Sequence, residues 1–151
     1  EDASKVGLVL AKAPPQRRYF FNAGPTALNL AIPPRDGNAE VVSELTVMTD
    51  MKLVYAQPHM HLRGKAFAVQ MVLPDNTTQK LLNVPRYDFN WQYTYRCAEP
   101  VPVAAGSRIR ATGWFDNSTA NPANPVVPTT TIYFRSGPTV NTFRSPTAAK
   151  K

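Results

Sequence analysis

The amino-acid sequence predicts an all-β fold of about nine or ten short strands, an antiparallel β-sandwich or jelly roll. Short apolar segments with a period of two recur along the chain, and clusters of turn residues separate them. The chain also contains 15 prolines but only 7 glycines. Because proline interrupts both helix interiors and central strands, this composition favours short strands joined by proline-rich loops.

The size and composition indicate one globular domain. The chain has 151 residues, of which 43% are hydrophobic and 18% are charged, as is typical of a single domain with a core. We expect this domain to span residues 1–144 and residues 145–151 to form a flexible or partner-bound tail. Cys97 is the single cysteine, which excludes an intrachain disulfide and predicts a small buried apolar residue.

The first half of the chain shows five apolar segments that end at prolines, glycines or polar turn residues. Pro14-Pro15 and the run at residues 22–25 mark two of the expected turns. The alternation of the fifth segment ends at Pro58, so we expect the residues that follow to lie at or just beyond a strand end. The predicted strands are residues 6–10, 17–21, 28–32, 41–48 and 51–57.

The second half of the chain begins with the clearest alternation. In residues 66–73, every second residue from Phe67 onward is large and apolar, which predicts a strand with one face more deeply buried. A hairpin turn at residues 74–76 leads into the next strand, and the polar segment at residues 116–125 is expected to be a loop. The predicted strands are residues 66–73, 79–84, 92–97, 108–115 and 130–135.

The net charge of +7 comes from basic residues that are scattered along the chain, with adjacent pairs only at Arg17-Arg18 and Lys150-Lys151. This distribution is typical of a solvated basic surface, and it predicts no nucleic-acid binding. An acidic protein partner and peripheral contact with an anionic membrane stay open. No apolar run has the length of a membrane-spanning helix, so we expect no transmembrane segment.

The two histidines of the chain, His59 and His61, are the strongest candidates for a functional site. In an extended strand, residues i and i+2 point to the same face, so both imidazoles could bind one metal ion while Met60 points the opposite way. This pattern predicts half of a copper or zinc site. A Ser-His-Asp triad would need a histidine outside this motif, and paired carboxylates and a phosphate-binding glycine loop are not evident. We therefore assign no catalytic residue.

Three motifs, taken in order, carry a resemblance to a known family. They are PHMHLRGK at residues 58–65, PRYDFNWQ at residues 85–92, and FDNS at residues 115–118 followed by NPANP at residues 121–125. The chain resembles, over residues 6–143, the C-terminal domain of copper type II, ascorbate-dependent monooxygenases, the family of the peptidylglycine α-hydroxylating and dopamine β-monooxygenases, and especially its bacterial relatives. The resemblance implies that His59 and His61 bind one copper ion on a jelly-roll sandwich, and that the protein is periplasmic or extracellular.

The resemblance is incomplete at two points. The family's third copper ligand is a methionine in a segment of the form Gly-X-Thr-X-Asp-Glu-Met, whereas residues 137–143 read GPTVNTF and place Phe143 at the methionine position. Met48, Met51 and Met71 are conceivable substitutes, although each also suits a core. Complete members of the family have a preceding domain whose separate three-histidine copper site supplies an electron, and this chain has only 2 histidines.

Two functions therefore stay open. The first is an exported β-sandwich that serves as a binding or assembly subunit, with a protein partner or larger assembly and without catalysis by the isolated chain. The second is a mononuclear copper protein, either an oxygen-activating half-enzyme or an electron carrier, that uses His59 and His61. The missing ligand and the missing domain favour the first and leave enzymatic activity open.

The motif at residues 85–92 also has two interpretations. Its aromatic residues could bind a sugar or a peptide, but we favour a structural role in which they supply buried area while Asp88 and Asn90 fix a turn. For residues 116–118 we likewise favour a loop-bracing role over a catalytic one.

Overall fold

The computed structural model describes residues 3–14, 20–27, 29–123, 132–134 and 139–144. These residues form ten strands and no helix, which confirms the all-β prediction. No helix long and apolar enough to span a membrane occurs in this part of the chain. The strands are β1 (Phe20–Thr26), β2 (Leu30–Ile32), β3 (Ala39–Thr46), β4 (Met51–His59), β5 (Gly64–Val72), β6 (Thr78–Val84), β7 (Tyr95–Val103), β8 (Arg108–Phe115), β9 (Ile132–Phe134) and β10 (Thr139–Arg144).

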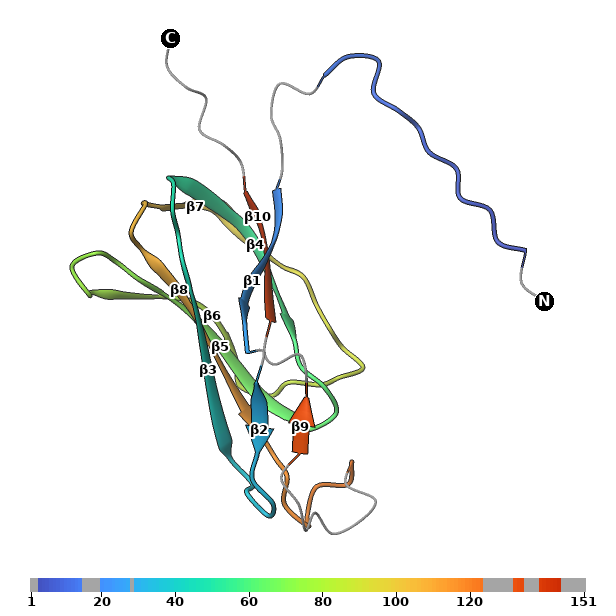
Figure 1. The fold of residues 1–151 in the computed structure, drawn as a ribbon, viewed down its shortest axis with the longest axis vertical. Coiled ribbons are helices and arrows are strands. Elements are labelled where there is room, and N and C mark those ends of the chain that lie inside the picture. The colour runs from blue at the N-terminus through green and yellow to red at the C-terminus, as the bar shows by residue number, and fades with distance from the viewer. Residues whose placement is uncertain (1–2, 15–19, 28, 124–131, 135–138, 145–151) are drawn as a thin grey trace.

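The strands form two four-stranded sheets and one two-stranded ribbon (Figure 1). The first sheet has the order β1-β10-β4-β7, the second has the order β3-β8-β5-β6, and β2 pairs with β9. All the pairings are antiparallel. The structure is therefore the antiparallel β-sandwich expected from the sequence. The jelly-roll connectivity and the domain limit at residue 144 stay predictions.

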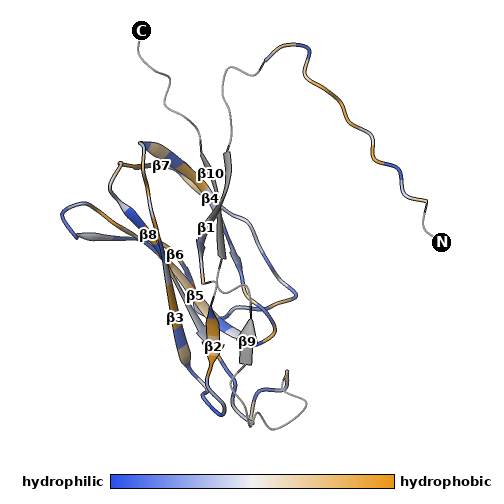
Figure 2. Cartoon of the chain, in the orientation of Figure 1, coloured by the Kyte–Doolittle hydropathy of each residue, from blue (hydrophilic) through white to orange (hydrophobic). Residues whose placement is uncertain are grey.

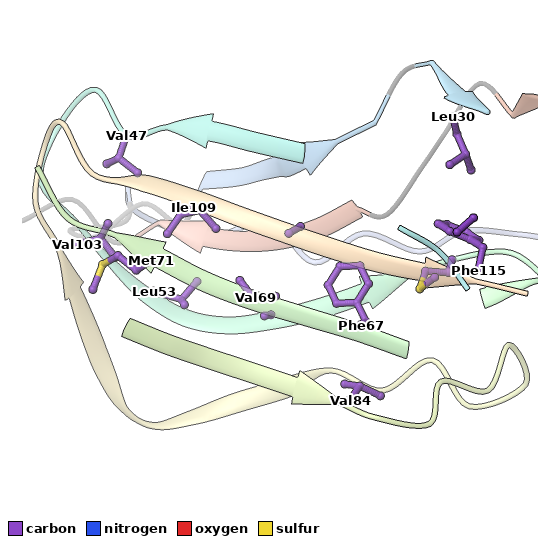
Figure 3. Packing of buried hydrophobic residues seen from close by; sticks show 14 of the residues in the cluster. Leu30, Val47, Leu53, Phe67, Val69, Met71, Val84, Val103, Ile109 and Phe115 are labelled. Carbon is purple, nitrogen blue, oxygen red and sulfur yellow. The ribbon is translucent and has the colours of Figure 1, made fainter. Parts of the chain in front are cut away.

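Alternation of buried and exposed side chains builds the core of the sandwich. In β8 every second residue is buried, and in β5 Phe67, Val69 and Met71 are buried on one face. This is the face that the period-two pattern of residues 66–73 predicted. Figure 3 shows these side chains in one cluster with Leu53 of β4. Cys97 is half-buried and packs against this core, and burial raises the pKa of its thiol.

Two parts of the first sheet lie elsewhere than predicted. The sequence predicts a turn at residues 22–25, but β1 runs through them with a bulge. It predicts a strand at residues 92–97, but β7 begins only at Tyr95 and contains two prolines. Both corrections have the same cause. β1 and β7 are the edge strands of their sheet. A proline is tolerated in an edge strand, because its missing N–H can face the side on which no strand pairs.

Some predictions fall partly or wholly outside the described residues. Of the strand predicted at residues 17–21, only the last two residues are described, and they begin β1. Of the strand predicted at residues 130–135, residues 132–134 form β9. The tail at residues 145–151 lies entirely outside the described part. β10 has no counterpart among the predicted strands.

The segment predicted as the first strand is not a strand. Residues 3–14 are exposed and belong to no sheet, and the four large apolar side chains at residues 6–10 are 81–101% exposed. Figure 1 shows this segment extending away from both sheets, and Figure 2 shows its apolar stretch in orange. The prediction was wrong because an apolar run becomes a strand only where neighbouring backbone supplies its hydrogen bonds.

Candidate metal centre

His59 and His61 lie at and just beyond the end of β4, where β7 no longer pairs with this strand. β7 pairs with β4 only as far as Ala56, whereas β10 pairs with it up to His59. β4 therefore continues through Pro58, where the sequence predicted its end, because one side of the strand is open there. His59 is the last residue of β4. His61 lies in the turn that follows, where the Gly64 N–H donates to the His61 carbonyl over 2.8 Å.

Side chains of the histidine motif point alternately away from the core and into it, as they do along an extended backbone. Met60 is 1% exposed and packs in the core, whereas His59 and His61 are half-buried. The centroids of the two imidazole rings are 5.3 Å apart, and the rings are inclined at 72°. Two imidazoles that share one copper ion through bonds of about 2 Å have centroids roughly 5 Å apart. The two rings therefore have the spacing of ligands of one ion.

Gln92 fixes the imidazole of His59. Its Oε1 lies 2.5 Å from Nδ1 of His59, and its Nε2 donates to the Phe89 carbonyl over 2.9 Å. The bond to Phe89 settles the orientation of the amide, because the nitrogen that faces Phe89 leaves the oxygen facing His59. An oxygen acceptor requires the proton on Nδ1 of the neutral imidazole. Nε2 of His59 then carries the lone pair that a metal ion needs, and it makes no hydrogen bond within the described part of the chain.

Tyr87 and Gly64 hold the backbone between the two histidines. The Tyr87 hydroxyl donates to the Met60 carbonyl over 2.7 Å and accepts from the Met60 N–H over 3.0 Å. Gly64 makes room for this contact, since a Cβ at Gly64 would lie 2.8 Å from both Met60 Cβ and Tyr87 Cδ1. Burial raises the pKa of Tyr87 against the opposite effect of its hydrogen bond to Met60. The phenol therefore keeps its proton and remains a donor at neutral pH.

Residues 85–92 form one wall of the centre. Asp88 Oδ1 accepts from the Asn90 N–H over 2.8 Å, which confirms the predicted turn. The Phe89 ring stacks against the His61 imidazole, with centroids 6.4 Å apart and an interplanar angle of 28°. Trp91, in contrast, is 64% exposed. The expectation that the aromatic residues of this motif supply buried area is therefore wrong for Trp91.

Asn117 ties the turn after the histidines to the loop between β2 and β3. The residue is fully buried, and its Oδ1 accepts from Arg63 Nε over 3.1 Å. Its Nδ2 donates to the Pro33 carbonyl over 2.8 Å, and its backbone N–H donates to the Asp36 carbonyl over 2.7 Å. This is the loop-bracing role predicted for residues 116–118.

The methionines of the chain do not complete the site. Met51 begins β4, so it lies about 26 Å along the strand from His59. Met48 precedes Met51 and is 81% exposed, and Met71 is buried near the far end of β5. Met60, the remaining one of the 4 methionines, points into the core. The structure also brings together no group of three or more His, Cys, Asp or Glu residues within its described ranges.

The register of β10 bears on the third-ligand position. β10 places the backbone of Thr139 opposite His59, and Phe143 pairs with Phe21 of β1. Phe143 follows Thr139 by four positions, which is about 13 Å along a strand. The backbone at Phe143 is thus far from the histidines, and its assignment to the family's methionine position stays a prediction from the resemblance.

Sequence reasoning missed the supports of the histidine pair. Gln92 contacts a residue 33 positions away, and Tyr87 contacts a residue 27 positions away. No local pattern predicts either contact. Both residues belong to the motif at residues 85–92. This motif contributed to the family resemblance, but the sequence did not indicate which residues it contacts.

Comparison with protein families places the chain in one of them. Residues 24–127 match the family model for the copper type II ascorbate-dependent monooxygenase, C-terminal domain. The match spans more than half of the chain and includes both histidines. The chain therefore belongs to this family of copper-dependent monooxygenase domains. A comparison with individual curated proteins gave no match.

Proposed function

We propose that this domain binds one copper ion through His59 and His61 and serves as a copper-binding subunit of a larger assembly. The observation that carries the proposal is the 2.5 Å contact between His59 Nδ1 and Gln92 Oε1. This contact holds the ring in one orientation and leaves Nε2 available, as the outer partners of metal-bound histidines do. Neutral imidazoles suit copper, and the family makes copper the metal to test.

Bound copper would supply one-electron redox chemistry at this end of β4. The chain itself contributes two imidazoles, the Gln92 amide that keeps the proton on Nδ1 of His59, and the Phe89 ring beside His61. The imidazoles would bind the ion, the Gln92 amide orients the His59 ring, and the Phe89 ring shields His61. We assign none of them as an acid or base toward a substrate.

We propose further that the isolated chain does not hydroxylate a substrate. Both of its 2 histidines belong to one motif, so the three-histidine site that the resemblance implies for a complete enzyme would need another domain or subunit. Electrons would also have to come from that partner. A copper ion held by His59 and His61 would then supply either an oxygen-activating half-site or an electron carrier within the assembly, and the domain would supply the binding surface.

We also propose a periplasmic or extracellular location, for which the support is the family resemblance. The support for a protein partner is the exposed apolar stretch at residues 6–10 together with the incomplete ligand set. Fractionation of the producing cells tests the location. Recovery of the protein with cytosolic markers contradicts it.

Titration of the purified chain with Cu(II), followed by electron paramagnetic resonance, tests the copper proposal. At one equivalent we expect hyperfine splitting from coordinated nitrogen, and we expect its loss in the double variant His59→Ala, His61→Ala. Met48→Ala is the matched control, because this exposed thioether is remote from the histidines. Identical spectra from the parent and the double variant would refute the assignment. Ascorbate-dependent substrate hydroxylation by the isolated chain would refute the claim that it needs a partner.

A further inference from the structure

A second site adjoins the metal centre. An open pocket of about 40 Å³ is lined by residues that include Pro58, Arg86, Tyr87, Trp91, Tyr93 and Tyr95, and neither histidine lines it. We propose that this pocket binds a proline-rich, acidic peptide segment of a partner protein in the polyproline II conformation. The inference concerns a surface that the copper proposal does not use.

Three exposed aromatic side chains form a row along this pocket. Trp91, Tyr93 and Tyr95 are 64%, 50% and 36% exposed. The ring centroids are 4.8 Å apart between Trp91 and Tyr93, and 6.4 Å apart between Tyr93 and Tyr95. A polyproline II helix rises about 3.1 Å per residue, so two of its residues advance about 6 Å. The 6.4 Å gap between Tyr93 and Tyr95 therefore matches the advance of one dipeptide, and the 4.8 Å gap between Trp91 and Tyr93 lies between the advance of one residue and of two.

The tilt of the rings favours proline over sugar. Adjacent rings are inclined at 46° and 54°, so their faces meet at an angle and are not parallel. A row of sugar units would need ring faces that lie nearly parallel, in order to stack one unit on each. Pyrrolidine rings instead insert between inclined aromatic rings, as they do in the aromatic-lined grooves that recognise proline-rich peptides.

The polar edges of the same rings complement a polyproline backbone. The Trp91 indole N–H and the hydroxyls of Tyr93 and Tyr95 make no hydrogen bond within the described part of the chain. A polyproline II segment has no internal hydrogen bonds, so its carbonyls are free to accept. The pocket thus combines exposed aromatic faces with unused donors, which is the pairing that this kind of peptide requires.

The charge at the pocket predicts an acidic flank on the peptide. Arg86 is exposed and forms no ion pair in the described ranges. The one lining carboxylate, Asp88, accepts from Asn90 through Oδ1, and no ion pair joins it to Arg86 among the described residues. The chain as a whole has a net charge of +7. An Asp or Glu beside the prolines would therefore pair with the Arg86 guanidinium.

Fluorescence titration of the full chain with a synthetic peptide tests the proposal. The probe is a blocked proline-rich peptide of about ten residues, roughly three turns of polyproline II, with a Glu at one end. The variant Trp114→Phe removes the second tryptophan and leaves Trp91 as the reporter. We expect saturable binding that weakens about tenfold or more in Tyr93→Ala, and a loss of similar size in Trp91→Ala when measured by calorimetry.

Charge and surface controls sharpen the result. Arg86→Gln should weaken binding of the Glu peptide to the level of a matched Gln peptide, and Val42→Ala, an exposed apolar residue on β3, should leave binding unchanged. Equal affinity of the parent, Trp91→Ala and Tyr93→Ala would overturn the proposal. Displacement of the peptide by a soluble oligosaccharide would also overturn it, as would self-association of the chain that blocks the pocket and disappears in Trp91→Ala.

Discussion

His59 can bind a metal ion only if its imidazole presents an unprotonated nitrogen, and one amide group controls this. Gln92 accepts from Nδ1 of His59 because its own nitrogen is engaged by the Phe89 carbonyl. A chain of two hydrogen bonds thus sets the tautomer of the ring. At the scale of single residues, the proposed metal centre therefore depends on Gln92 as well as on the two histidines.

Replacing Gln92 by alanine should lower the copper affinity of the chain about 10–100-fold, the usual cost of losing an outer partner of a metal-bound histidine. Competition against a copper chelator of known affinity measures the change. Gln79→Ala is the matched control, because Gln79 is an exposed glutamine on β6. If Gln92→Ala binds copper as tightly as the parent, the role assigned to Gln92 is wrong.

The residues of the centre differ in how far the sequence predicts them. His59 and His61 are neighbours in sequence, so strand geometry alone places both imidazoles on one side of the chain and Met60 in the core. Gln92 comes from a loop 33 positions away. Its role depends on how that loop packs against the end of β4, which no local pattern encodes.

At the scale of elements, the centre lies at the junction between β4 and β5. The turn between them is closed by the Gly64 N–H and the His61 carbonyl, and Tyr87 bonds to both backbone groups of Met60. The close approach of Gly64, Met60 and Tyr87 leaves no space for a further carbon atom. The geometry of the histidine pair therefore depends on a glycine at this position.

Gly64→Ala should destabilise the protein by about 1–3 kcal/mol, because the new Cβ overpacks the contact with Met60 and Tyr87. Urea denaturation followed by far-UV circular dichroism measures the change in the free energy of unfolding. Gly37→Ala provides the comparison, since its Cβ would meet Ser118 Cβ at an ordinary 3.5 Å, and we expect a change within about 0.5 kcal/mol. Equal stability of Gly64→Ala and the parent would show that the turn can relax.

The strands predicted best are those in which the alternation of apolar residues follows directly from burial of one face. β5 and β8 are inner strands. Alternate burial marks β8 along its length and β5 from Phe67 to Met71, and the predicted limits of β8 are those observed. β1 and β7 are edge strands that tolerate prolines, and the same prolines suggested turns. The strand predicted at residues 6–10 is not formed, because the composition of this segment suits a strand but no neighbouring strand pairs with it.

At the scale of the whole molecule, the sandwich is a scaffold that carries two distinct surfaces at one end. The histidine pair lies on β4 and the turn after it, while the aromatic pocket lies along residues 84–95, and residues 85–92 contribute to both. The sequence predicted the fold class, and its assignment of His59 and His61 as metal ligands stays a prediction. The motif at residues 85–92 suggested an aromatic binding surface only as the less favoured interpretation. It did not indicate that Tyr93 and Tyr95 line one pocket with Arg86 and Trp91, because this depends on the path of the loop that leads into β7.

The copper content of the purified protein tests the central claim most directly, because it requires no knowledge of a substrate. The parent chain and the double variant His59→Ala, His61→Ala are loaded with copper, dialysed against a weak chelator and analysed for metal and protein. We expect one copper ion per parent chain and none in the double variant. A parent chain without copper, or equal copper in both proteins, would contradict the assignment of His59 and His61 as a copper site.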